Sequence, residues 1–216
     1  MSSRDAILSR IRTALGNEPD RQLPPIPKVW PVENPSADQM AERFTKELQE
    51  VAGEVCRCGS METVADKLAE IVEGLNAEFI GRTDHALCNE LVADLPPECF
   101  VNDGANPNPT ELAKLPAALI GADTLLADTG TVMVACATPH HRLMCYLPPV
   151  CIVIAKTSQL VEHMPAAWEK IAPRAADTEL RGEFVFITGP SRTADIEKIL
   201  ILGVHGPKRL VVLLVG

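Results

Sequence analysis

The sequence predicts an α/β protein with a mostly parallel sheet, a local hairpin and an N-terminal helical arm. From residue 54 onward, strand-like apolar runs alternate with helix-length amphipathic segments, which is the pattern of βαβ units. Most of these runs are apolar throughout, as strands are when helices cover both faces of their sheet. A proline-dense stretch separates one short helix from this alternating part. We therefore expect an arm over residues 1–35 and one α/β domain over residues 36–216.

The arm combines a helix with an extended linker. Residues 3–15 are predicted to form an amphipathic helix whose apolar face carries Ile7, Leu8, Ile11 and Leu15. The prolines at positions 19, 24, 25, 27, 31 and 35 then disfavour both helix and sheet, so the chain there is expected to be extended. A lone apolar-faced helix must bury that face, either on its own domain or on another subunit. The second alternative would make the protein a homo-oligomer held by its arm.

The domain is expected to begin with a helix that is capped by Ser36 and Gln39 and ended by Gly53. The expected strands after it are 54–58, 77–81, 98–102, 118–128, 131–138, 151–155, 183–188 and 209–215. The expected helices are 60–74, 83–95, 110–115, 158–171 and one that begins near Thr193. Turn residues between the runs 118–128 and 131–138 predict a local antiparallel pair.

Charge and composition argue against several classes of partner. The net charge is −9, whereas binding to nucleic acid or to an anionic membrane needs a basic face. Aromatic residues make up 4% of the chain, too few for a surface that stacks single-stranded nucleic acid. No apolar run is long enough to span a membrane, and the first residues lack the apolar core of a signal peptide. The cytoplasm is therefore the expected location.

The spacing of the cysteines and histidines indicates that the protein binds no metal. The chain has seven cysteines, an odd number, which we expect to remain free thiols. Cys56 and Cys58 fall on one face of a predicted strand, which favours packing over metal ligation. His140 and His141 have the residue type of zinc ligands, but neighbouring histidines in an exposed loop are more often polar loop residues.

Two loops are candidates for ligand binding, because open α/β sheets bind ligands beyond the carboxyl ends of their strands. The first is Asp128-Thr129-Gly130-Thr131. The second is Gly189-Pro190-Ser191-Arg192-Thr193, which is predicted to open a helix with Asp195 in its first turn. Free N–H groups, hydroxyls and a guanidinium at such a helix start would bind a small anion, unless the loop only caps the helix. If both loops serve one ligand, they must face the same cleft.

The C-terminal stretch ITGPSRTADIEKILILGVHGPKRLVVLLVG (187–216) resembles the signature of the LUD-domain proteins, the lactate-utilisation protein C family. ADTGT (127–131), Arg142 and LPP (147–149) resemble the central signature of that family. The resemblance covers roughly residues 36–216 and implies a three-layer α/β/α Rossmann-like fold, similar to the sugar-phosphate isomerase and CoA-transferase group. Arg142 and His205 lie in these motifs and join the candidate ligand-binding residues. The alternative for His205 is a turn histidine that holds backbone groups.

The resemblance also implies a role in L-lactate oxidation to pyruvate beside iron–sulfur partner proteins. We expect the chain to have no cofactor of its own, because its sequence contains no CxxCxxC motif. CoA-transferase relatives use a glutamate nucleophile, whereas this turn carries Asp128, which puts covalent acyl transfer in doubt. No catalytic residue is established, and Asp128 is the candidate. It either positions a ligand hydroxyl or caps the turn. Two other functions stay open. One is a stand-alone enzyme acting on a phosphorylated or CoA-linked metabolite, and the other is a structural or regulatory subunit without catalysis.

Overall fold

The computed structural model describes residues 3–16, 30, 33–93, 95–101, 108–177, 183–194 and 200–216. The chain divides into two compact units, Met1–Pro31 and Val32–Gly216. In the first unit, helix α1 (Ser3–Leu15) leaves Ile7, Ile11 and Leu15 exposed. Most of the expected linker lies outside the described residues. None of the helices in the described part of the chain is long and apolar enough to cross a membrane.

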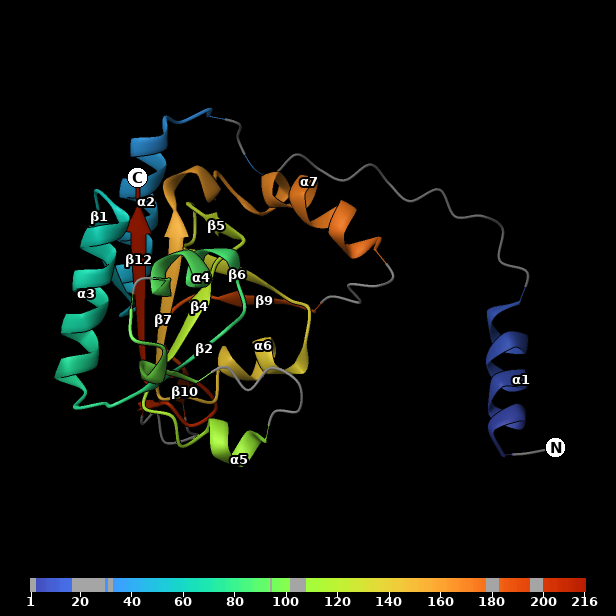
Figure 1. The fold of residues 1–216 in the computed structure, drawn as a ribbon. Coiled ribbons are helices and arrows are strands. Elements are labelled where there is room, and N and C mark those ends of the chain that lie inside the picture. Colours follow the sequence, from blue (N-terminus) through green and yellow to red (C-terminus); the bar gives the residue numbers. More distant parts are fainter. Residues whose placement is uncertain are drawn as a thin grey trace. The chain divides into compact units, whose positions relative to one another are not determined.

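The second unit is built on a six-stranded parallel sheet in the order β1-β12-β7-β4-β2-β3 (Figure 1). Its strands are β1 (Glu54–Cys58), β2 (Ile80–Arg82), β3 (Phe100–Val101), β4 (Ala118–Gly121), β7 (Val150–Lys156) and β12 (Arg209–Val215). Strands β12 and β7 pair over seven residues, from Arg209 opposite Val150 to Val215 opposite Lys156. The mostly parallel sheet that the sequence predicts is confirmed.

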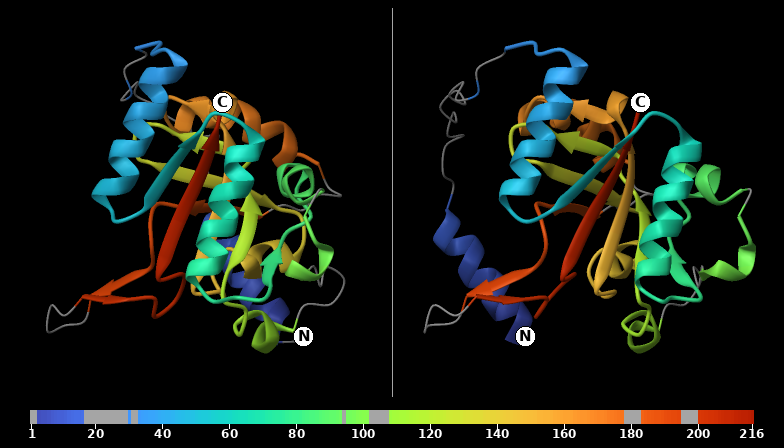
Figure 2. Two further views of the ribbon diagram at one scale, coloured as in Figure 1. Left: turned by 60° about the vertical axis from the view of Figure 1, so that its left-hand side comes forward. Right: turned by 90° about the vertical axis from the view of Figure 1, so that its left-hand side faces the viewer.

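The two faces of this sheet are covered by different elements. Helices α3 (Met61–Gly74) and α4 (Ala86–Val92) pack on one face. The other face is covered by a second sheet together with α2 (Ala37–Glu50), α5 (Pro109–Leu112) and α6 (Pro139–Met144). Since side chains alternate along a strand, Val211 and Leu213 of β12 face the α3 side, and Leu210 and Val212 face the α2 side. Figure 2 shows α2 and α3 on opposite sides of β12, which confirms the predicted layered α/β fold.

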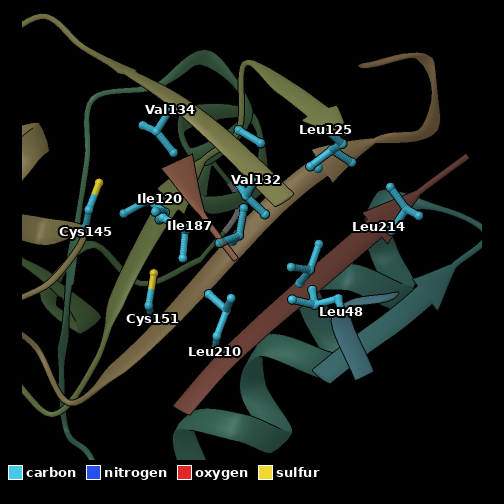
Figure 3. Packing of buried hydrophobic residues seen from close by; sticks show 14 of the residues in the cluster. Leu48, Ile120, Leu125, Val132, Val134, Cys145, Cys151, Ile187, Leu210 and Leu214 are labelled. Atoms are coloured by element: carbon cyan, nitrogen blue, oxygen red, sulfur yellow. The ribbon is translucent and has the colours of Figure 1, made fainter. Parts of the chain in front are cut away.

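The second sheet has four strands in the order β8-β5-β6-β9. They are β5 (Thr124–Leu126), β6 (Thr131–Cys136), β8 (Leu160–Val161) and β9 (Glu183–Ile187). The antiparallel β5–β6 pair is the predicted hairpin, and β9 extends it on the far side of β6. Figure 3 shows Leu125, Val132 and Ile187 of this sheet beside Ile120 and Leu210 of the parallel sheet. Helix α7 (Met164–Ala175) packs on its other face.

Side-chain caps fix where two of the helices begin. The predicted capping box of α2 is present, because Gln39 N donates to Ser36 Oγ at 3.2 Å and Ser36 N donates to Gln39 Oε1 at 2.8 Å. In α7, the N–H of Ala166 donates to Nδ1 of His163 at 3.2 Å. This cap makes the helix begin at Met164 rather than at residue 158, and a short 3₁₀ turn and β8 occupy the residues between.

The prediction of a helix that begins near Thr193 is wrong. Strands β10 (Arg192–Ala194) and β11 (Leu200–Leu202) instead form an antiparallel pair in which Thr193 lies opposite Ile201. Both of these residues are β-branched, which favours strands over helices. Asp195, expected in the first helical turn, lies outside the described residues. The predicted anion site relied on free N–H groups at the start of a helix near Thr193, and these residues belong to a strand instead.

Candidate functional site

The two loops predicted from the sequence lie side by side. Thr129 Oγ1 is 2.8 Å from Thr131 Oγ1, which is 2.8 Å from Thr188 Oγ1, the residue before the second loop. The pairing of β6 with β9 causes this, since Val132 lies opposite Ile187. Strands far apart in the sequence thus bring the loops together, as a shared site would require.

Helix α2, however, packs closely against both loops. A Cβ atom on Gly130, whose φ is +60°, would lie 2.7 Å from Leu48 Cα. A Cβ on Gly189 would lie 3.0 Å from a methyl carbon of Val51. Arg192 Nη2 donates to the carbonyl of Val51 at 2.5 Å, just past the end of α2. These contacts give Arg192 a structural role at the end of α2, and ligand binding by the two loops stays a prediction.

The remaining loop residues have structural partners. The hydroxyl of Thr129 donates to Asp128 Oδ1 at 3.3 Å, and Asp128 N donates to the carbonyl of Glu162 at 3.1 Å. Asp128 therefore has the partners of a turn-capping residue. Ser191 N donates to the carbonyl of Pro207 at 2.8 Å, which ties the second loop to the turn before β12. His205 is exposed in that turn.

Arg142 lies apart from these loops, on α6. It forms an ion pair with Glu183 at the start of β9. Both side chains line a cavity of about 140 Å³, together with Cys136 and Thr138. Among the described residues, none of the other predicted ligand-binding residues lines this cavity.

The topology of the parallel sheet points to another location. After β2, the chain leaves the sheet through α4 on the α3 side, whereas after β4 it leaves through β5 on the α2 side. Because β2 and β4 are neighbours, the chain departs in opposite directions from adjacent strands. Such a topological switch point is where open α/β sheets bind ligands, beyond the carboxyl ends of the strands. His85 follows β2 and Asp123 follows β4, so both lie at this point.

His85 is held as a neutral imidazole with a defined proton position. Its Nδ1 accepts the N–H of Leu87 at 3.2 Å and caps α4, so the ring proton is assigned to Nε2. Burial lowers the pKa of His85, an effect that Asp123 partly offsets and Arg174 reinforces. The ring lies directly against the backbone of Gly121, where a Cβ would be 2.6 Å from Cε1 and nearer still to Nδ1. At neutral pH the imidazole can thus donate one hydrogen bond from Nε2.

Asp123 is held in the cluster by two hydrogen bonds. Its Oδ2 accepts the N–H of Ala135 at 2.7 Å, and its Oδ1 accepts from Arg174 Nη1 at 2.7 Å. The Asp123 side chain is only 18% exposed, so this pair is screened less than a surface ion pair. Arg174 comes from α7, so the second sheet and its helix both contribute to the site.

Helix α6 closes the cluster with two histidines. His140 is buried, with Nε2 3.2 Å from the carbonyl of Arg82, and its Nδ1 has no hydrogen-bond partner within the described residues. Burial and the neighbouring His140 lower the pKa of His141, whereas the nearby carboxylates of Asp84 and Asp123 oppose this. The expectation that these two histidines are exposed loop residues is wrong, because Thr138 caps a helix that turns them toward the sheet. We call His85, Asp123, His141 and Arg174 the switch-point cluster.

Sequence reasoning missed this cluster although part of its signal was present. His85 and Asp123 each come within three residues after an apolar strand, where the rule for strand ends applies. Arg174 had no such signal, since it lies on a helix of another layer.

The part of the chain that the structure describes holds no group of three or more histidine, cysteine, aspartate or glutamate side chains placed to bind a metal. Cys56 and Cys58 both lie against the α3-side core, as expected for cysteines on one face of a strand.

Comparison with known proteins identifies relatives along the whole chain. The chain is 36% identical over 98 residues to Lactate utilization protein C of Bacillus pumilus (strain SAFR-032), covering 45% of this chain and 41% of that protein. This match therefore spans about two fifths of the length of that relative. A second relative, Lactate utilization protein C of Exiguobacterium sp. (strain ATCC BAA-1283 / AT1b), is 28% identical over 225 residues, covering 100% of this chain and 96% of that protein.

The fold has a solved counterpart. A DUF162 family protein from Deinococcus radiodurans superposes with a TM-score of 0.60 at 16% identity, covering 84% of this chain and 99% of that one. At this identity the likeness concerns the fold alone. The family model of the LUD domain matches residues 41–215. Since this match covers nearly all of the second unit, the chain belongs to the LUD domain family.

Proposed function

We propose that this protein is a component of a lactate-utilisation system and that it binds a small anionic ligand at the switch-point cluster. The similarity over the full chain to a protein named Lactate utilization protein C supports the first part. The second part rests on one observation, the neutral His85 beside the Asp123–Arg174 pair at the topological switch point. Partner proteins with iron–sulfur clusters and the oxidation of L-lactate to pyruvate belong to the same proposal.

The cluster can bind a carboxylate or hydroxyl oxygen through two kinds of donor. The first donor is the Nε2–H of His85, which carries no charge. It can therefore bond a ligand oxygen whether that oxygen is neutral or negatively charged. Arg174 has five N–H donors and uses one nitrogen on Asp123, so its other donors can reach a ligand oxygen. Asp123 holds the guanidinium in place and partly neutralises it. A short hydroxy acid or keto acid carries both types of acceptor.

The binding part can be tested with a variant that keeps the fold. In His85→Asn, the side-chain oxygen can still accept the Leu87 N–H, because asparagine is among the best helix caps. The variant loses the Nε2 donor, so affinity for L-lactate or pyruvate should fall about ten-fold while the melting temperature stays the same. Calorimetry on the parent and variant chains measures this. Equal affinity in both would remove His85 from the site.

The proposed membership in a lactate-utilisation system has to be tested with protein purified from its native cells. We expect a tagged chain to co-purify with iron–sulfur proteins from lactate-grown cells, and the eluate to oxidise L-lactate with an artificial electron acceptor. The isolated chain should show no lactate oxidation. Turnover of a phosphorylated or CoA-linked metabolite by the isolated chain would support a stand-alone enzyme instead. An eluate without partner proteins and without activity would contradict the proposal.

A further inference from the structure

Helix α1 carries an apolar face that the first unit leaves exposed. Ile7, Ile11 and Leu15 recur every four residues, so they form one stripe along the helix, and they are 57%, 48% and 63% exposed. No residue of this helix is buried. A helix of 13 residues is marginal in water unless its apolar face packs on another surface. The stripe is therefore expected to pack on a surface outside the first unit.

The same helix is basic, whereas the rest of the chain is acidic. Arg10 and Arg12 lie on either side of the apolar stripe, because successive residues of an α-helix are about 100° apart around its axis. Residues 1–31 hold five basic and three acidic residues, which gives a net charge of +2. Since the whole chain carries −9, residues 32–216 carry −11. The surface that suits α1 is therefore apolar with negative charge beside it.

The second unit has an apolar pocket between α3 and the edge of the parallel sheet, where β3 is the last strand. Its volume is about 270 Å³, and its walls include Ala65, Leu68, Ala69 and Val72 of α3 together with Leu95 and Phe100. Among the described residues that line it, Glu73 alone is charged. Sites for small ligands usually hold several polar groups that orient the ligand, so this pocket is better suited to aliphatic side chains. We call it the α3 pocket.

A row of carboxylates runs along one side of the α3 pocket. Glu62, Asp66 and Glu73 are all exposed on α3. Each of them is three or four positions away from Ala65 or Ala69, and residues at these spacings are neighbours on a helix surface. Helix α3 thus presents negative charge directly beside the apolar lining of the pocket. This arrangement is complementary to α1, in which positive charge flanks an apolar stripe.

We propose that α1 of one copy of the chain binds in the α3 pocket of a second copy. The apolar stripe of α1 fills the pocket, and its arginines lie beside the carboxylates of α3. The occupant comes from a second copy because the single chain leaves the stripe exposed, and because six prolines between positions 19 and 35 are expected to keep the connection extended. Two-fold symmetry makes the exchange reciprocal, so each dimer contains two such contacts. This dimer does not depend on the proposed lactate function.

The mass of the full-length chain in solution, measured by light scattering, tests the helix side of this contact. The parent chain should have about twice the 23.3 kDa mass of one copy. Ile11→Asp places a charge in the apolar stripe, so the dissociation constant of the dimer should rise about 100-fold or more, because both contacts are lost. Ser9→Asp is the control, since it adds the same charge on the opposite side of α1 and should leave the dimer intact.

A second variant tests the pocket side. Ala69 lines the α3 pocket and is exposed, so Ala69→Arg should block the pocket without disturbing the core. We expect this variant to be a monomer with the melting temperature of a folded chain. Gly74→Arg is the control, because it adds the same charge to α3 at a position that does not line the pocket and where nothing lies within 4 Å of a Cβ.

Mixing the two monomeric variants distinguishes a second copy from the helix's own domain. The Ala69→Arg chain keeps a functional helix, and the Ile11→Asp chain keeps an open pocket. An equimolar mixture should therefore form a dimer with one contact, which is weaker than the parent dimer. The proposal is overturned if the parent chain is a monomer, if either variant remains a dimer, or if the mixture stays monomeric.

Discussion

Replacing Gly121 by alanine should displace the imidazole of His85 from the switch-point cluster. The added methyl group would lie 2.6 Å from His85 Cε1 and nearer still to Nδ1. Carbon atoms in contact prefer about 3.5–4.0 Å, so the ring must retreat by roughly 1 Å or more. That movement breaks the bond from Leu87 N to Nδ1, which is worth about 1 kcal/mol. Overpacking of this kind costs about 1–3 kcal/mol in total.

The displacement also has a signature in titration. Burial holds the pKa of His85 below its ordinary value, so a ring pushed toward water should titrate at a higher pH. NMR titration of the histidine Cε1 protons measures this, with His85→Asn used to assign the signal. Gly59→Ala is the control, because nothing lies within 4 Å of a Cβ there. If Gly121→Ala melted like the parent and its His85 signal titrated unchanged, the ring could not lie where we place it.

Three further outcomes follow from contacts described above. Gly130→Ala should lower the free energy of unfolding by about 3 kcal/mol or more, because the left-handed backbone costs about 1–2 kcal/mol and the new methyl would meet the backbone of Leu48; urea denaturation checks this. Arg192→Ala should lower the free energy of unfolding by about 1 kcal/mol, since its one described partner is the carbonyl of Val51 at an exposed helix end, and the same denaturation measures this. The hydrogen bond from Arg209 lowers the pKa of the Glu54 carboxyl in the folded protein. This pair should therefore stabilise the fold above pH 4.5, the pKa of Glu54 in the unfolded chain, and the stabilisation should disappear as the pH falls through the lower pKa of the folded protein. Melting temperatures of the parent and Arg209→Gln, measured between pH 7 and pH 3, should converge at low pH.

The parallel sheet could be predicted from the sequence because its strands are apolar on both faces. The second sheet could not. Residues 118–128 form one apolar run, and nothing in that run marks Ala122 as the point where the chain passes from one sheet to the other. The hairpin was predictable because Gly130 and its neighbours supply turn chemistry.

The candidate site was less predictable than the fold. The loops around Gly130 and Gly189 do meet, yet their glycines permit contact with α2, and glycine alone does not say whether a helix or a ligand comes close. The stretch after Arg192 has the residues of a helix start, but residues 192–194 instead pair as a strand with Leu200–Leu202, a few positions further along the chain. Arg174 reaches Asp123 across 51 positions of sequence, which no local pattern records.

The connection between β4 and β5 consists of Ala122 and Asp123 alone. Ala122 N donates to Ile154 of the parallel sheet at 3.0 Å, and Asp123 N donates to Met133 of the second sheet at 2.9 Å. The residue that anchors Arg174 is thus also the joint between the two sheets. The length of this joint should be under strict selection, because one inserted residue would turn β5 over and point Leu125 away from the core. A relative with a longer connection between β4 and β5 would need a bulge in it to keep β5 in register. Without a bulge, the residue at the position of Asp123 would no longer reach the site. The structure of such a relative would distinguish these two cases.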